Sequence, residues 1–230
     1  MRNIEVEIRG EQVGGVIAFP KSGAGPGVIV IQEWWGLVPH IQGVVSRLAG
    51  AGFVALAVDH YRGVETTEPD EAQKLMMGLQ VSAAAADLAG AAAYLVGRPE
   101  VTTSEVAAMG FCMGGGLALL APTVSAQIAC AVAFYPAMPW PDYAPDWANY
   151  DGKAAIIHKA QSDEGWAAPK IAEYAAEITA HGGRVAVFDY PGSEHAFFND
   201  DRPEVYSPGH SGAAWERSTA FFRAECTVRS

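Results

Sequence analysis

The chain has 230 residues, half of them hydrophobic, which suits one larger α/β domain with a substantial buried core. Its 15 basic and 26 acidic residues give a formal net charge of −11. No lysine and arginine cluster runs along the sequence, so we expect neither nucleic acid nor an anionic membrane surface as a partner.

The N-terminal segment MRNIEVEIRG alternates charged and apolar residues and carries no secretory signal pattern. No window reaches the roughly 18 apolar residues that a membrane span needs. The three cysteines, Cys112, Cys130 and Cys226, form no CxxC pair. We therefore expect a reduced, cytoplasmic protein rather than a disulfide framework or a zinc site.

Apolar runs of strand length alternate with segments of helical spacing along the whole chain. In chain order, the sequence predicts strands at 4–9, 13–19 and 27–31, a helix over 38–52, a strand at 53–58, two helices within 70–97, strands at 104–110, 128–134 and 154–159, a helix over 167–183, a strand at 184–190 and a helix over 212–226. The strands at 27–31 and 53–58 are continuous and β-branched rather than alternating, which is typical of buried parallel strands.

This alternation predicts an α/β fold with a mostly parallel central sheet and helices on both of its faces. We see no internal repeat, low-complexity linker or break in composition, so a single domain over 1–230 is expected. In such sheets, ligands bind beyond the carboxyl ends of the strands. Residues at those strand ends are therefore the candidates for chemistry.

The stretch Gly110-Phe111-Cys112-Met113-Gly114 has the form G-x-C-x-G, a nucleophile elbow with cysteine in place of serine. A strand that turns abruptly into a helix lifts the central side chain toward substrate, and only small residues fit two positions before and after it. The start of the following helix favours an anion, hence a thiolate and an oxyanion. The alternative is a buried cysteine at a glycine-rich turn; Cys130 and Cys226 are predicted to be packing residues.

A cysteine nucleophile needs a base, which needs an orienting acid, and in this architecture the acid precedes the histidine in the chain. Of the four histidines after Cys112, His195 lies in the glycine-bearing loop YPGSEHAFF, just past the predicted strand 184–190. Asp163 follows the predicted strand 154–159 and is our candidate acid, with Glu164 as the alternative. No set of His, Asp and Glu residues has metal-ligand spacing, so no metal is expected.

With these residues placed, the sequence resembles the dienelactone hydrolase family of α/β-hydrolases, which are carboxymethylenebutenolidase-like enzymes. The resemblance covers nearly the whole chain and rests on four motifs in the right order. They are IVIQEWWGL after the first central strand, GFCMGGGLALL at the elbow, IIHKAQSDEGWAAP around the acid and YPGSEHAFF around the histidine.

The resemblance implies a catalytic triad of Cys112, Asp163 and His195. It also implies that Glu33 is the family's glutamate beside the nucleophile, where the carboxylate interacts with the thiol and helps govern its ionisation. A carboxylate near a thiolate is repulsive, so this pair favours a neutral thiol until substrate rearranges it. The backbone N–H groups of Trp34 and Met113 match the family's oxyanion hole.

The sequence also departs from the family. Members that act on anionic lactones carry an arginine four residues after the catalytic histidine, where this chain has Asn199, with Arg202 nearby. The segment that holds a second family arginine has only acids and one lysine here, and Arg62 is the nearest basic residue. An arginine-poor mouth predicts a preference for neutral substrates. The expected substrate pocket includes Trp35, Tyr61, Trp166 and Asn199.

The predicted function is the hydrolysis of a small carboxylic ester or lactone, without a metal or organic cofactor. Two alternatives remain open. A thioesterase or acyltransferase would use the same triad with a different acceptor, and a non-catalytic binding protein would use the same fold without the chemistry. The sequence does not determine the oligomeric state, and a monomer is compatible with it.

Overall fold

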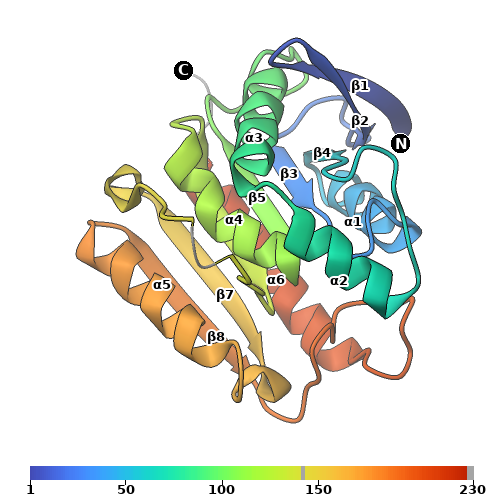
Figure 1. Ribbon diagram of the computed structural model, residues 1–230. Coiled ribbons are helices and arrows are strands. Elements are labelled where there is room, and N and C mark those ends of the chain that lie inside the picture. Colours follow the sequence, from blue (N-terminus) through green and yellow to red (C-terminus); the bar gives the residue numbers. More distant parts are fainter. Residues whose placement is uncertain (141–142, 227–230) are drawn as a thin grey trace.

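The computed structural model describes residues 1–140 and 143–226, and its centre is an eight-stranded sheet in the order β1-β2-β4-β3-β5-β6-β7-β8 (Figure 1). The strands are β1 (Arg2–Ile8), β2 (Glu11–Ala18), β3 (Gly27–Ile31), β4 (Val54–Val58), β5 (Val106–Phe111), β6 (Ile128–Phe134), β7 (Ala154–Ala160) and β8 (Arg184–Tyr190). The N-terminal hairpin of β1 and β2 pairs antiparallel, and all neighbours from β4 to β8 run parallel. The predicted α/β sheet is confirmed.

Helices cover both faces of this sheet (Figure 1). On one face lie α3 (Val81–Val96) and α4 (Met113–Val124), with α5 (Ala168–Ala180) against β8. The other face carries α1 (Pro39–Gly50) and α6 (Pro208–Glu225). Every residue of β3, β4, β5 and β6 is buried, because helices lie on both sides of these strands. This explains their continuous apolar sequences.

Two helices occupy the alanine-rich block, as predicted: α2 (Pro69–Gly78) and α3, which meet at an angle of 82°. Helix α6 begins at Pro208, four residues before the predicted start at 212, because a proline is well placed in the first turn of a helix. In the described part of the chain no single helix is long and apolar enough to cross a membrane; only the bent pair α2–α3, taken together, meets that test.

Candidate active site

Cys112 stands at the sharp turn between β5 and α4, where its backbone has φ 54° and ψ −119°. A positive φ is costly for any residue other than glycine and persists only where the surroundings enforce it. A Cβ on Gly110 would overlap the carbonyl oxygen of Gly114, and one on Gly114 would lie 2.5 Å from the carbonyl oxygen of Ile31. The glycines of the G-x-C-x-G motif therefore let the elbow pack against β3.

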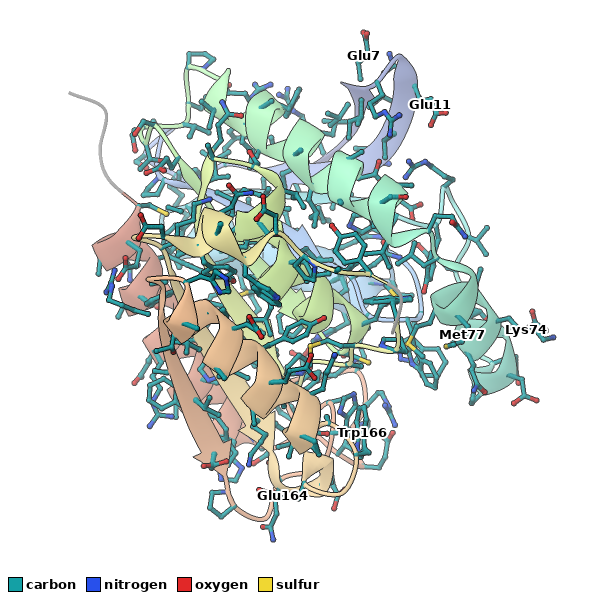
Figure 2. All side chains as sticks on the ribbon, turned by 60° about the vertical axis from the view of Figure 1, so that its left-hand side comes forward. Glu7, Glu11, Lys74, Met77, Glu164 and Trp166 are labelled. Atoms are coloured by element: carbon teal, nitrogen blue, oxygen red, sulfur yellow. The ribbon has the colours of Figure 1, made fainter. Side chains whose placement is uncertain are left out.

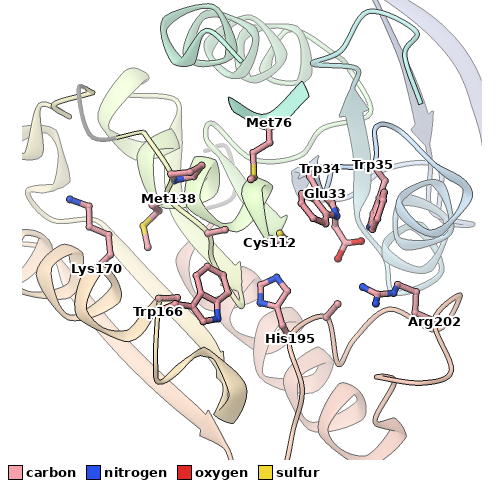
Figure 3. Close-up of a pocket in the computed structure, with 14 residues that line it drawn as sticks. Glu33, Trp34, Trp35, Met76, Cys112, Met138, Trp166, Lys170, His195 and Arg202 are labelled. Carbon is pink, nitrogen blue, oxygen red and sulfur yellow. The ribbon is translucent and has the colours of Figure 1, made fainter. Parts of the chain in front are cut away.

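Hydrogen bonds fix the backbone of Cys112 from three directions. Its N–H donates to Phe134 O at 3.0 Å, which ties the elbow to the end of β6. Its carbonyl oxygen accepts from Gly115 N at 2.9 Å and from Ala137 N at 2.8 Å. The strained turn is thus held by the neighbouring strand as well as by its own helix, and the side chain of Cys112 faces a cavity (Figure 3).

The loop after β8 places His195 at the same cavity, with Asp163 behind it. Asp163 Oδ1 lies 2.8 Å from His195 Nδ1, and its carboxylate is fully buried. Its Oδ2 accepts from Ala160 N at 3.2 Å, while Ser162 Oγ accepts from the backbone N–H of His195 at 2.6 Å. Two independent contacts therefore join the loop after β7 to the loop that carries the imidazole.

Glu164, the alternative acid, points away from the site. Its side chain is exposed at the surface and its Oε1 pairs with Lys159 at 2.6 Å (Figure 2). The structure therefore brings Asp163, and not Glu164, into contact with His195.

Two opposing effects act on the pKa of His195. Burial lowers it, but the charge of Cys112, the hydrogen bonds to Asp163 and Cys112 and the charge of Asp163 outweigh burial and raise the pKa to about 10. The contacts with Cys112 and Asp163 therefore stabilise the protonated form of the His195 ring. The same geometry fixes the ring orientation, so that Nδ1 faces Asp163 and Nε2 is left for the thiol.

Glu33 follows β3 and is 1% exposed, with both carboxylate oxygens occupied. Tyr135 donates its hydroxyl to Oε1 at 3.3 Å, and Asn199 donates its amide to Oε2 at 2.8 Å. Burial, and then the charges of Glu33 and Cys112, raise the pKa of Tyr135 well above its usual value, so its hydroxyl stays protonated. Glu33 lines the same cavity as Cys112, although its hydrogen bonds go to Tyr135 and Asn199.

The two expected oxyanion-hole amides lie at the start of α4 and directly after Glu33. Met113 is the first residue of its helix, so its N–H has no carbonyl four residues back within the helix. Among the described residues, neither this N–H nor that of Trp34 donates to another protein group. Both amides are therefore available to an oxygen beside Cys112.

The cavity has a volume of about 460 Å³ and is bordered mostly by apolar side chains (Figure 3). Trp35 and Trp166, two residues of the expected pocket, are among its lining, and Trp166 is 54% exposed. Tyr61 does not line it, which corrects the prediction: its ring is buried and its hydroxyl donates to Met113 Sδ at 3.0 Å. Asn199 is also corrected, because its amide is spent on Glu33 and it borders a neighbouring cavity.

The cavity has two basic residues in its lining, although the sequence predicted an acidic, arginine-poor mouth. Arg202 and Lys170 both line the cavity, and the guanidinium of Arg202 lies on the side toward Glu33 (Figure 3). Arg202 Nε donates to Glu204, while its two terminal nitrogens have no partner among the described residues. Arg62, by contrast, binds Asp87 with both terminal nitrogens, at 2.7 and 2.8 Å, and does not reach the cavity.

Sequence reasoning did not single out Tyr135, Met76 or Met138. Tyr135 follows β6 directly, has φ 36°, and its ring centroid lies 5.0 Å from that of His195. Its place at the carboxyl end of a parallel strand was the signal that could have identified it. Met76 of α2 and Met138 form part of the cavity wall. In the described part of the chain, no group of three or more His, Cys, Asp or Glu residues could hold a metal ion.

Comparison with known proteins gives a consistent result. The model of the "Dienelactone hydrolase family" matches residues 13–226. The chain is 34% identical over 235 residues to "Protein usf" of Aquifex pyrophilus, covering 97% of this chain and 98% of that protein. It is 34% identical over 136 residues to the carboxymethylenebutenolidase of Pseudomonas sp. strain P51, covering 55% of this chain and 56% of that enzyme.

Among solved structures, the fold is similar to that of a dienelactone hydrolase-like promiscuous phosphotriesterase, P91, from metagenomic libraries. The TM-score is 0.86 at 22% identity, and the match covers 98% of each chain. Identity at this level supports the shared fold alone.

Proposed function

Because the chain belongs to the dienelactone hydrolase family, we propose that it hydrolyses small carboxylic esters or lactones with Cys112 as the nucleophile. In this proposal, His195 transfers the protons and Asp163 orients His195. One observation supports it above all others: a cysteine at a strained strand–helix turn faces a cavity that also contains His195, whose Nδ1 is 2.8 Å from a fully buried carboxylate.

In the first half of the reaction, the Cys112 sulfur attacks the substrate carbonyl carbon and the thiol proton resides on His195. The carbonyl oxygen becomes an oxyanion beside the amides of Trp34 and Met113. These amides are fixed by the backbone, so they stabilise the developing charge without reorganising. Collapse of this intermediate breaks the ester C–O bond, and the departing alcohol takes the proton from His195. The product of this half is a thioester on Cys112.

In the second half, His195 takes a proton from a water molecule, whose oxygen attacks the thioester carbonyl. The resulting intermediate expels the Cys112 thiolate and releases the carboxylic acid. His195 gives its proton back to the thiolate or retains it as an imidazolium–thiolate pair. Asp163 holds the imidazole in one orientation through both halves and stabilises its positive form.

Glu33 places a second charge close to the nucleophile. Tyr135 and Asn199 hold its carboxylate in one position, and it lines the cavity with Cys112. Its negative charge opposes a thiolate, whereas the imidazolium of His195 favours one. We propose that these two charges together set the reactivity of the Cys112 thiol. Removing the charge of Glu33 should raise this reactivity, and removing the charge of His195 should lower it.

The acyl part of the proposed substrates is compact, because the cavity at Cys112 is about 460 Å³ and is bounded by Trp35, Trp166 and Met138. These side chains suit an apolar or conjugated acyl group. Arg202 adds a positive charge at one side of the cavity. Acidic lactones and esters therefore fall within the proposed range alongside neutral ones.

The test is to mix the protein with p-nitrophenyl acetate and follow p-nitrophenol release together with the intact mass. The expected result is a burst of p-nitrophenol equal to the enzyme concentration and a mass increase of one acetyl group on the peptide that contains Cys112. The variant Cys112→Ala should give neither, while the matched variant Cys226→Ala should give both. Full activity in Cys112→Ala would overturn the proposal.

A further inference from the structure

A second cavity lies beside the catalytic one and shares two residues with it. Its volume is about 790 Å³, and Trp35 and Arg202 line both cavities. Figure 3 shows these two side chains on the same side of the catalytic cavity, on the side of Cys112 opposite Lys170. The two cavities are therefore adjacent, and a single ligand could extend from one into the other alongside Trp35.

The wall of the second cavity is tied to the catalytic machinery by hydrogen bonds. Asn199 is 3% exposed; its amide donates to Glu33, and its Oδ1 accepts from Asp201 N at 3.1 Å. Thr66 N donates to the carbonyl oxygen of Trp35 at 3.0 Å. The residues at the second cavity thus belong to the loops that position Glu33, Trp34 and His195. A ligand bound there would have a defined position relative to Cys112 and His195.

The wall also contains a buried side chain with an unused polar atom. His40 is 4% exposed, and its Nδ1 lies 3.0 Å from Asp200 Oδ1. Its Nε2 has no hydrogen-bond partner among the described residues. This atom is itself buried, so the polar groups that are open to the cavity come from the other residues of its wall.

The second cavity is lined by polar side chains of several kinds. Glu65 and Asp201 supply carboxylates, Thr66 and Thr67 supply hydroxyls, and Arg202 supplies donors. A purely anionic group would meet the two carboxylates, and a purely cationic group would meet the guanidinium. A hydroxyl group both donates and accepts, so several hydroxyls match this mixture. The indole of Trp35 offers an apolar face for the carbon side of such a group.

We propose that the second cavity binds the alcohol portion of the substrate, and that this portion is polyhydroxylated, as in a sugar ester. The inference rests on the proposed ester hydrolysis. His195 and the residues from Asn199 to Arg202 come from one loop, and His195 protonates the departing alcohol, so the alcohol leaves on the side of this loop. The reaction is ordinary hydrolysis. The ester C–O bond breaks and the sugar leaves with the proton from His195; water then attacks the Cys112 thioester and releases the carboxylic acid.

The test compares two esters of one acid, ethyl butyrate and glucose 6-butyrate, in wild type and in Thr67→Trp. Thr67 is exposed and, of these two cavities, lines only the second, so a tryptophan there takes up space in the second cavity alone. We expect wild type to prefer the sugar ester in kcat/KM by about tenfold, equivalent to about 1.4 kcal/mol. Thr67→Trp should abolish this preference and leave kcat/KM for ethyl butyrate unchanged. The matched variant Thr179→Trp, exposed on α5, should behave as wild type.

A second variant tests the chemistry rather than the space. Asp201→Asn removes one carboxylate acceptor without adding volume, and we expect it to lower kcat/KM for the sugar ester and not for ethyl butyrate. Equal kcat/KM for the two esters in wild type, or equal losses on both esters in Thr67→Trp, would overturn the inference. Hydrolysis of neither ester would instead count against the proposed function, so the two failures are distinguishable.

Discussion

The side-chain amide of Asn199 donates a hydrogen bond to Glu33 Oε2 at 2.8 Å, joining two buried residues that lie 166 positions apart in the chain. The amide therefore neutralises part of a buried carboxylate and is not free to bind substrate. Tyr135 completes the environment of Glu33 from the end of β6. The carboxylate is consequently held by two neutral donors at the cavity that Cys112 also lines.

Replacing Asn199 by Ala leaves Glu33 Oε2 without a donor in a buried site. We expect the free energy of unfolding to fall by about 1–3 kcal/mol, the cost of an unsatisfied buried group. Asn199→Asp should cost more, because it places a second carboxylate against the first. Urea unfolding curves measure both, with Asn3→Ala on the exposed edge of β1 as the control. Unchanged stability in both Asn199 variants would show that this hydrogen bond contributes nothing.

Asp163→Asn should leave the fold intact and lower kcat for p-nitrophenyl acetate by roughly 10⁴-fold, as occurs when the acid of a catalytic triad is neutralised. The physical reason is that an amide neither stabilises the imidazolium nor enforces the same tautomer at His195. The neighbouring variant Glu164→Gln is the matched control and should retain nearly full activity, since Glu164 pairs with Lys159 at the surface. Loss of activity in Glu164→Gln together with full activity in Asp163→Asn would show that Glu164, and not Asp163, is the acid that orients His195.

Cys112 should be the thiol whose alkylation by iodoacetamide abolishes activity. The pKa of His195 is raised to about 10, so its ring is positively charged at neutral pH beside Cys112, and a neighbouring cation activates a thiol. A free cysteine, with a pKa of about 8.5, is mostly protonated there. Cys112 should therefore react faster than glutathione at about pH 7, and Asp163→Asn should remove this advantage.

The other two thiols provide an internal control. Burial, and then a hydrogen bond with Cys226, raise the pKa of Cys130 well above its ordinary value, and both side chains are buried. We expect neither to be labelled in the folded protein, which peptide mass mapping after a brief exposure to reagent will check. Label on Cys130 with Cys112 unmodified would contradict the assignment.

His158 should make stability depend on pH. Burial, and then the charge of Arg217, lower its pKa to about 3, whereas in the unfolded chain the pKa is about 6.5. Its neutral ring accepts from Tyr190 at 2.8 Å and donates to Ser218 at 3.0 Å. Because the unfolded state binds the proton more tightly between these values, stability falls as pH decreases from about 6.5 toward 3, by up to about 1.4 kcal/mol per unit.

His158→Gln keeps a donor and an acceptor but does not titrate in this range, so its unfolding free energy should depend less steeply on pH. His181→Gln, on the exposed end of α5, is the control and should keep the wild-type slope. Urea unfolding at a series of pH values provides the measurement. An unchanged slope in His158→Gln would show that another group dominates the acid transition.

Arg202→Gln should lower kcat/KM for an acidic lactone by about ten- to a hundred-fold, the value of about 1.5–3 kcal/mol for a hydrogen bond to a charged group. Turnover of the corresponding methyl ester should not change, because it carries no carboxylate. The variant Arg62→Gln is the comparison, since Arg62 is bound to Asp87 outside the cavity and should affect stability rather than selectivity. Equal losses on acid and ester would exclude a role for Arg202 in selectivity.

The sequence by itself predicted the strands, the two helices in the alanine-rich block and the sharp turn at Cys112. These features depend on neighbours in the chain. Continuous β-branched runs favour strands through local preference, and G-x-C-x-G specifies an elbow because small residues are required two positions on each side. The order of the acid and the histidine after consecutive strands placed Asp163 and His195 at one edge of the sheet for the same reason.

Only the tertiary structure decided how the loops beyond that edge meet. Arg202 lines the cavity at Cys112, Arg62 is bound to Asp87, the Tyr61 hydroxyl contacts Met113, and Asn199 donates to Glu33. No periodicity encodes these contacts, because they join different segments, among them Asp87 of α3 and Met113 of α4, whose side-chain directions depend on how those segments pack together. Local sterics define the elements and the elbow, whereas long-range packing defines the charges that surround the reacting thiol.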